Sequence, residues 1–146
     1  MTRIQVEIRD DERPELDAAL GERIYEFNSS TTGIHNAVLL NASVEDEAGR
    51  LVAGLTGHTW GGCCEILRLW VHESTRGAGV GTALMQAAER EAIRRGCRQI
   101  VLSTHSFQAP RFYEKLGFRR LAAIPNYPRG HESLIYFKEL AGASGA

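Results

Sequence analysis

A change of periodicity in the middle of the chain constrains the fold more than any other feature. Residues 63–71 are rich in apolar side chains and predict a strand. A glycine-rich stretch, Arg76–Gly81, follows, and residues 80–95 then repeat apolar side chains at helical spacing. The sequence therefore predicts a strand that runs through a tight turn into a helix, so that the helix N-terminus lies at the end of the strand.

The segments on either side predict an α+β fold. We expect an antiparallel meander of three strands before the turn, and after the helix a buried strand, a short helix and two final strands. The expected ranges are 37–40, 51–59 and 63–71 for the meander, 99–103 for the buried strand, 110–116 for the short helix, and 121–124 and 133–137 for the last strands. Strand 63–71, the helix and strand 99–103 form a right-handed crossover with parallel strands. The result is a central mixed, largely antiparallel sheet with helices on both faces.

The first part of the chain predicts one more strand and a helix. Ile4, Val6 and Ile8 alternate with polar residues, which is typical of a strand. A helix is expected to follow, with Asp10 or Asp11 as its cap and Pro14 in its first turn.

Length and composition indicate one globular domain. The chain has 146 residues, of which 43% are hydrophobic and 24% charged. We expect a single domain over residues 1–140 and a flexible tail over residues 141–146. The net charge of -1 provides no overall field that would attract nucleic acid or a membrane. With no apolar run near ~20 residues and no signal peptide, the expected location is the cytoplasm. We expect the three cysteines to be buried and unreactive, and no metal site.

The glycine-rich turn is suited to binding an anion. The amides at a helix N-terminus lack partners and lie at the positive end of the helix dipole, and glycines let phosphate oxygens approach the backbone. Arg76 adds a fixed positive charge. The Lys-Ser/Thr pair of a nucleotide-hydrolysing loop is missing, which excludes a P-loop ATPase. From the residues alone, a phosphate site and a tight connection both stay open.

Two motifs together resemble the GNAT superfamily of N-acetyltransferases. Arg76-Gly77-Ala78-Gly79-Val80-Gly81 matches the signature Arg/Gln-x-x-Gly-x-Gly/Ala of that family, and Leu69-Trp70-Val71 precedes it as a strand of the family does. Ala109-Pro110-Arg111-Phe112-Tyr113-Glu114-Lys115-Leu116-Gly117-Phe118 is similar to its second signature. The resemblance covers residues 36 to 140 well, and residues 1 to 35 only by the order of elements.

The resemblance implies a site for acetyl-coenzyme A (acetyl-CoA). The sheet would splay between strands 63–71 and 99–103. The backbone of Leu69 and Val71 would pair with the pantetheine arm of the cofactor, and the amides of Gly77 to Gly81 would hold the pyrophosphate. The implied cofactor-binding residues are Leu69, Trp70, Val71, Arg76, Gly77, Ala78, Gly79, Val80, Gly81, Thr82, Ser106 and Tyr113. Ser106 stands where many members have an asparagine that contacts the cofactor arm, and Gln108 is an alternative for that contact.

Acetyl transfer to an amine requires a base, a donor to the oxyanion and an acid for the leaving thiolate. The resemblance makes Tyr113 the candidate acid and the amide of Leu69 the oxyanion donor. Glu65 is the candidate base, because strict alternation places it on one face with Leu69 and Val71. The alternatives are a core aromatic for Tyr113 and a solvated strand-end carboxylate for Glu65. His72 and His105 are weaker candidates.

The resemblance favours an N-acetyltransferase that transfers an acetyl group to a small amine or amino-acid derivative by direct attack in a ternary complex. A protein acetyltransferase acting on lysine or an N-terminus is an alternative within enzymes. A non-catalytic sensor of acyl-CoA is the alternative from another class. A homodimer is an expectation that rests on the family alone.

Overall fold

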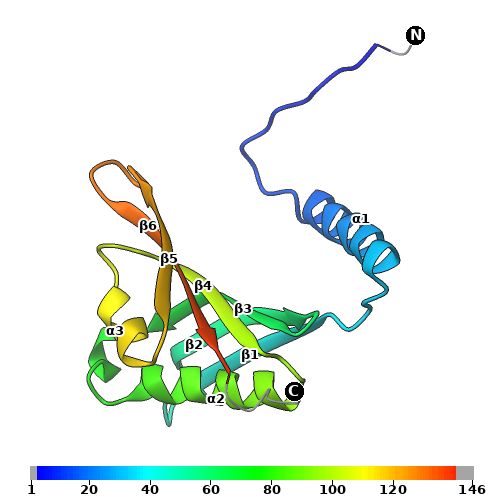
Figure 1. Ribbon diagram of the computed structural model, residues 1–146. Helices are drawn as coiled ribbons and strands as arrows, with labels where there is room; N and C mark the ends of the chain where they lie inside the picture. Colours follow the sequence, from blue (N-terminus) through cyan, green and yellow to red (C-terminus); the bar gives the residue numbers. More distant parts are fainter. Residues whose placement is uncertain (1–2, 141–146) are drawn as a thin grey trace. The chain divides into compact units, whose positions relative to one another are not determined.

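The computed structural model describes residues 3–140, and the proposed tail at residues 141–146 lies outside this range. The chain divides into two compact units, Met1–Ile34 and His35–Ala146, and each is described by itself (Figure 1). The single domain expected over residues 1–140 stays a prediction. No helix within the described range is long and apolar enough to cross a membrane.

The first unit contains one helix, α1 (Pro14–Thr32). Proline occupies its first turn as predicted, and Gly33 ends it with a φ of 73° while its amide donates to the carbonyl of Ser29. The residue before the helix is Arg13, which makes no side-chain cap. The predicted cap at Asp10 or Asp11 is therefore wrong. The Asp11 carboxylate instead accepts a 2.8 Å hydrogen bond from Nε of Arg9, which also lowers the pKa of Asp11.

The predicted strand at residues 4–8 is also wrong. Ile4, Val6 and Ile8 are exposed and lie in irregular backbone. A strand needs a neighbour to pair its amide and carbonyl groups. Alternation of side chains indicates a strand only where such a neighbour exists, and the described residues offer this segment none.

The second unit is built on a six-stranded sheet in the order β1-β2-β3-β4-β6-β5. Its elements are β1 (Val38–Glu45), β2 (Leu51–Trp60), β3 (Cys63–Val71), the 3₁₀ turn η1 (Glu73–Thr75), α2 (Val80–Arg94), β4 (Gln99–His105), α3 (Pro110–Lys115), β5 (Arg119–Pro125) and β6 (Glu132–Glu139). Among the strands of the described residues, β3 and β4 pair in parallel, and the other pairs are antiparallel. The predicted α+β class with a mixed, largely antiparallel sheet is confirmed.

The parallel pairing between β3 and β4 is short. It joins Cys63–Ile66 to Gln99–Leu102 and then stops, although both strands continue. β3 stays paired to β2 as far as Val71, and β4 stays paired to β6 as far as His105. The two halves of the sheet therefore separate beyond Ile66 and Leu102, which is the splay that the resemblance implied.

One face of the sheet carries the core, and α2 covers it (Figure 1). Leu84, Met85, Ala88 and Ala92 of α2 are buried against the strands. The ring centroid of Tyr113 in α3 lies 6.4 Å from that of Tyr136 in β6, so α3 lies over the same face. The sequence predicts helices on both faces of the sheet. Those on this face are confirmed, and a helix on the opposite face stays a prediction.

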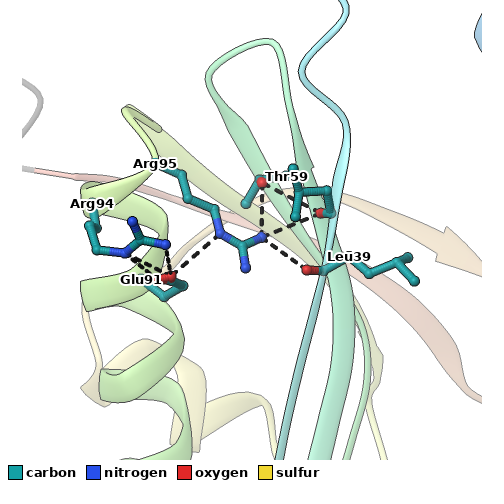
Figure 2. A network of polar contacts seen from close by, with 6 residues as sticks. Leu39, Thr59, Glu91, Arg94 and Arg95 are labelled. Carbon is teal, nitrogen blue, oxygen red and sulfur yellow. Dashed lines mark hydrogen bonds and ion pairs between the residues drawn. The ribbon is translucent and has the colours of Figure 1, made fainter.

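Arg95 fastens the C-terminal end of α2 to the first two strands (Figure 2). Its Nη1 donates to the carbonyl of Leu39 at 3.0 Å and to Oγ1 of Thr59 at 3.1 Å, and its Nε lies 3.5 Å from Glu91 of the same helix. Arg94 also binds Glu91, but its side chain is 73% exposed against 20% for Arg95. β1 is an edge strand of the sheet, and the guanidinium of Arg95 donates a hydrogen bond to its backbone.

Replacing Arg95 should therefore destabilise the protein more than replacing Arg94. For Arg95→Met, which keeps the apolar stem, we expect the free energy of unfolding to fall by about 1.5–3 kcal/mol, as for the loss of hydrogen bonds from a charged donor. Arg94→Met removes an exposed ion pair and should cost much less. Urea unfolding midpoints of the two variants and the parent measure the difference, and equal losses would contradict the anchoring role.

Candidate active site

The turn between β3 and α2 leaves backbone amides without partners at the start of the helix. Gly77 and Gly79 have φ values of 82° and 81°, a conformation that other residues rarely adopt. The first hydrogen bond that closes the helix runs from the amide of Ala83 to the carbonyl of Gly79 at 2.9 Å. The amides of residues 80–82 precede this bond and are the unpaired donors of the helix N-terminus. Unpaired amides at the positive end of a helix dipole are suited to an anion, and a phosphate site at this turn stays a prediction.

The same turn is held close to the end of β3. Nε of Arg76 donates to the carbonyl of Val71 at 3.2 Å, which leaves the other guanidinium donors of Arg76 available. A Cβ added at Gly81 would lie 3.3 Å from the ring of Phe112 and 3.5 Å from Val71, so the helix start packs closely against α3 and β3. His72 caps η1, since its Nδ1 accepts from the amide of Ser74 at 3.1 Å. This contact gives His72 a structural role.

A cavity of about 950 Å³ runs from this turn into the splay. Its lining comes from β3, the glycine-rich turn, the start of α2, β4 and α3. The lining residues are Leu67, Arg68, Leu69, Trp70, Val71, Thr75, Arg76, Gly77, Gly79, Val80, Gly81, Thr82, Ser103, Thr104, His105, Phe107, Gln108, Ala109, Phe112 and Tyr113. The structure thus brings together the predicted cofactor-binding residues except Ala78 and Ser106. We call this cavity the cleft.

Tyr113 lies where the wall of the cleft meets the core. Its side chain is only 8% exposed, and the rings of Phe112 and Phe118 contact it edge-on at centroid distances of 5.0 and 5.9 Å. Burial raises the pKa of the phenol above 10.0, its ordinary value. A phenol in this environment keeps its proton at neutral pH and can give it to a stronger base that forms beside it.

Glu65 does not lie on the predicted face. A β-bulge in β3 sets Ile66 opposite Gly57 and Arg68 opposite Thr56, so Leu67 is an extra residue. The extra residue reverses the alternation, which places Glu65 on the face opposite to Leu69 and Val71. Glu65 is 48% exposed and is not among the residues that line the cleft.

His58 is the residue near Glu65 that the sequence reasoning missed. Its Nε2 lies 3.5 Å from the Glu65 carboxylate, across the β2–β3 hairpin. The two-residue turn at Gly61–Gly62 sets Trp60 opposite Cys63, and counting back from that pair places His58 opposite Glu65. The hairpin signal in the sequence was therefore sufficient to find the pair.

Ser106 and Gln108 have different surroundings. Oγ of Ser106 accepts a hydrogen bond from the amide of Glu132 at 2.9 Å, so this side chain joins the end of β4 to the start of β6. Gln108 lines the cleft, and its Oε1 accepts from Oγ1 of Thr104 at 3.0 Å and from the amide of His105 at 2.7 Å. The amide nitrogen of Gln108 keeps its two protons for a ligand.

Two of the three cysteines are buried as the sequence predicts, and the third is buried only in part. Cys64 and Cys97 are buried, Cys63 is half-buried, and none of them lines the cleft. Burial raises the pKa of Cys64 to about 12. A thiol with so high a pKa is a poor nucleophile. Within residues 3–140, no group of three metal-ligating side chains lies close enough to hold a metal ion.

The fold and the cleft agree with the acyltransferase class. The sequence matches the Acetyltransferase (GNAT) family over residues 3–118. The chain belongs to this family, and it is an acetyltransferase.

Relatives and solved structures agree with this assignment. The chain is 42% identical to blasticidin-S acetyltransferase from Streptomyces morookaense over 95 residues, which cover 64% of the chain and 70% of that protein. It is 30% identical to an acetyltransferase from Agrobacterium fabrum over 110 residues, 75% of the chain and 80% of that protein. The crystal structure of an acetyltransferase from Bacillus cereus superposes with a TM-score of 0.76 and 30% identity, covering 92% of the chain and 98% of that structure.

The raised pKa of Tyr113 predicts a loss of stability at alkaline pH. The folded state disfavours the phenolate, so stability is full below the ordinary pKa of about 10 and is lost as the pH rises through the higher folded value. We expect Tyr113→Phe to lose less stability than the parent between pH 8 and pH 11. Urea midpoints at the two pH values measure this. Tyr127→Phe, at a side chain that is 58% exposed, is the control and should behave as the parent does.

Proposed function

We propose that the protein transfers an acetyl group from acetyl-CoA to the primary amine of a small molecule by direct attack within a ternary complex. The observation that carries the proposal is the continuity of the cleft. One cavity connects the unpaired amides at the start of α2 with the phenol of Tyr113 through the splay of the sheet. A donor with a phosphate at one end and a thioester at the other matches these two ends.

The residues present fit acetyl-CoA. The amides of residues 79–82 and the guanidinium of Arg76 would hold the pyrophosphate. The edge of β3 that faces away from β2 has no strand partner beyond Ile66, so the backbone of Leu69 and Val71 can pair with the amides of the pantetheine arm. We assign Gln108, rather than Ser106, to a contact with that arm, because Gln108 lines the cleft.

The chemistry follows from the groups in the cleft. Tyr113 gives its proton to the thiolate as the carbon–sulfur bond breaks. The oxyanion of the tetrahedral intermediate is assigned to the amide of Leu69. In this proposal the amine attacks the thioester directly and no acyl-enzyme forms, and none of the cysteines lines the cleft.

The acceptor is a small molecule in this proposal. The relative that is 42% identical is named for acetylation of blasticidin S, which supports an acceptor of that size over a protein chain. Blasticidin S is therefore the first amine to test, beside an aminoglycoside, free amino acids and a lysine-containing peptide. A cytoplasmic location and a homodimer are parts of the proposal that rest on the family alone.

Donor binding can be tested at the glycine turn. Gly79→Glu places a carboxylate at the helix N-terminus, where the pyrophosphate would bind. The negative charge of the carboxylate then repels the negative charge of the pyrophosphate. We expect the affinity for acetyl-CoA, measured by calorimetric titration, to fall by roughly a hundredfold or more, about 2.7 kcal/mol. Gly49→Glu is the matched control, because Gly49 has a φ of 78° and open space around it in the turn between β1 and β2. Equal affinities in the two variants would contradict the assignment of the site.

The acid role of Tyr113 predicts a selective loss of turnover. For Tyr113→Phe we expect kcat to fall by roughly a hundredfold with little change in the KM for acetyl-CoA, because the proton is needed only as the thiolate leaves. Release of free thiol with the best amine of the panel measures kcat. Tyr136→Phe removes a neighbouring buried hydroxyl that bonds Glu114 and lies outside the cleft lining, and it should keep its turnover. Undiminished kcat in Tyr113→Phe would remove the acid role.

A further inference from the structure

The cleft contains a single side chain that can take a proton from an amine near neutral pH. Its described lining has no aspartate or glutamate, and its only histidine is His105. An amine arrives largely protonated, so a reaction of the proposed kind needs such an acceptor. His105 is half-buried at the end of β4, on the wall that separates from β3 at the splay.

A backbone contact fixes which nitrogen of His105 is free. Nδ1 lies 2.9 Å from the carbonyl oxygen of Tyr127. A carbonyl oxygen only accepts hydrogen bonds, so Nδ1 carries the proton in the neutral ring. Nε2 then holds the lone pair and is the atom that can accept a proton. The carbonyl of Tyr127 thus orients the imidazole.

Stacked rings hold the imidazole in place. The ring centroids of Phe107 and Tyr127 both lie 5.3 Å from that of His105, with interplanar angles of 6° and 16°. His131 contacts Phe107 edge-on at 5.0 Å. The backbone on both sides is tied down, because the amide of His105 donates to Gln108 and the amide of Ser106 donates to the carbonyl of Glu132. The ring therefore does not need to be ordered when a substrate binds.

We propose that His105 is the general base of the acetyl transfer. This inference rests on the proposed function. Nε2 takes one proton from the ammonium group of the acceptor, and the free amine nitrogen then forms a bond to the thioester carbonyl carbon. The carbon–sulfur bond breaks, the sulfur takes the proton of Tyr113, and the amide nitrogen returns a proton to Tyr113. His105 releases its proton to solvent, so the products are the amide, coenzyme A and one proton.

The other candidates for the base are less well placed. Glu65 lies outside the cleft lining and beside Nε2 of His58. Nδ1 of His72 is occupied by the cap of η1. Among the titratable side chains nearby, Tyr127 is in ring contact with His105, and His131 contacts Phe107 edge-on. Arg129 lies in the connection between β5 and β6, and Glu132 is the first residue of β6.

The test compares His105→Asn with Glu65→Gln and His131→Asn. The side-chain amide of asparagine can still donate a hydrogen bond to the Tyr127 carbonyl, but it cannot accept a proton near pH 7. We expect kcat/KM at pH 7 for the best amine of the panel to fall about a hundredfold in His105→Asn. The defect should shrink as the pH rises toward the pKa of the acceptor amine, because more amine then arrives deprotonated. His131→Asn keeps the ring of His105 and should keep at least half of the activity, as should Glu65→Gln.

Two further measurements separate the proton role from a structural one. Calorimetric titration should give the same affinity for acetyl-CoA in His105→Asn and the parent. Nitrogen-15 NMR of the parent should show the neutral His105 ring protonated at Nδ1. Protonation at Nε2, a defect that is constant with pH, or a loss in Glu65→Gln without a loss in His105→Asn would each overturn the inference. Acetyl-CoA binding with no acetylation of any amine would instead remove the proposed function, and the role of His105 with it.

Discussion

The separation of β3 from β4 is the constraint on which the site depends. Parallel pairing ends at Ile66 and Leu102 because each strand then follows its antiparallel partner, β2 or β6. A sheet that stayed paired would have no cleft and no free backbone edge. The backbone amide and carbonyl groups that lose their strand partner at the splay are therefore available to an acyl donor that has amide groups of its own.

One extra residue in β3 decides which side chains lie beside that edge. The bulge at Leu67 keeps Ile66 in the core and returns Leu69 and Val71 to the same face, while it directs Glu65 and Arg68 to the other face. Without the extra residue, the buried half of β3 and the half that borders the cleft would be out of phase. The bulge thus lets one strand serve both the core and the site.

The sequence allowed the prediction of features that depend on local chemistry. The glycines at 77, 79 and 81, the helix after them and the hairpin at Gly61–Gly62 each follow from residues that are adjacent in the chain. The strand at residues 4–8 and the face of Glu65 were wrong because pairing and bulges depend on a partner strand. His105 could not be ranked from sequence, since the carbonyl that sets its tautomer is 22 residues away.

The two groups proposed to transfer protons are held in opposite ways, and each way suits its proposed task. Burial favours the protonated form of a phenol, which suits a group that must keep its proton until the thiolate forms. Tyr113 is only 8% exposed and packs against aromatic rings. An imidazole that must pass a proton to solvent in every turnover needs an open wall, and His105 is half-buried beside Phe107, which is 53% exposed. Packing of α3 against the core fixes the first group, and a separate stack on the connection between β5 and β6 fixes the second. Because the anchors are independent, the cleft can place an acid and a base from different elements without one constraining the other.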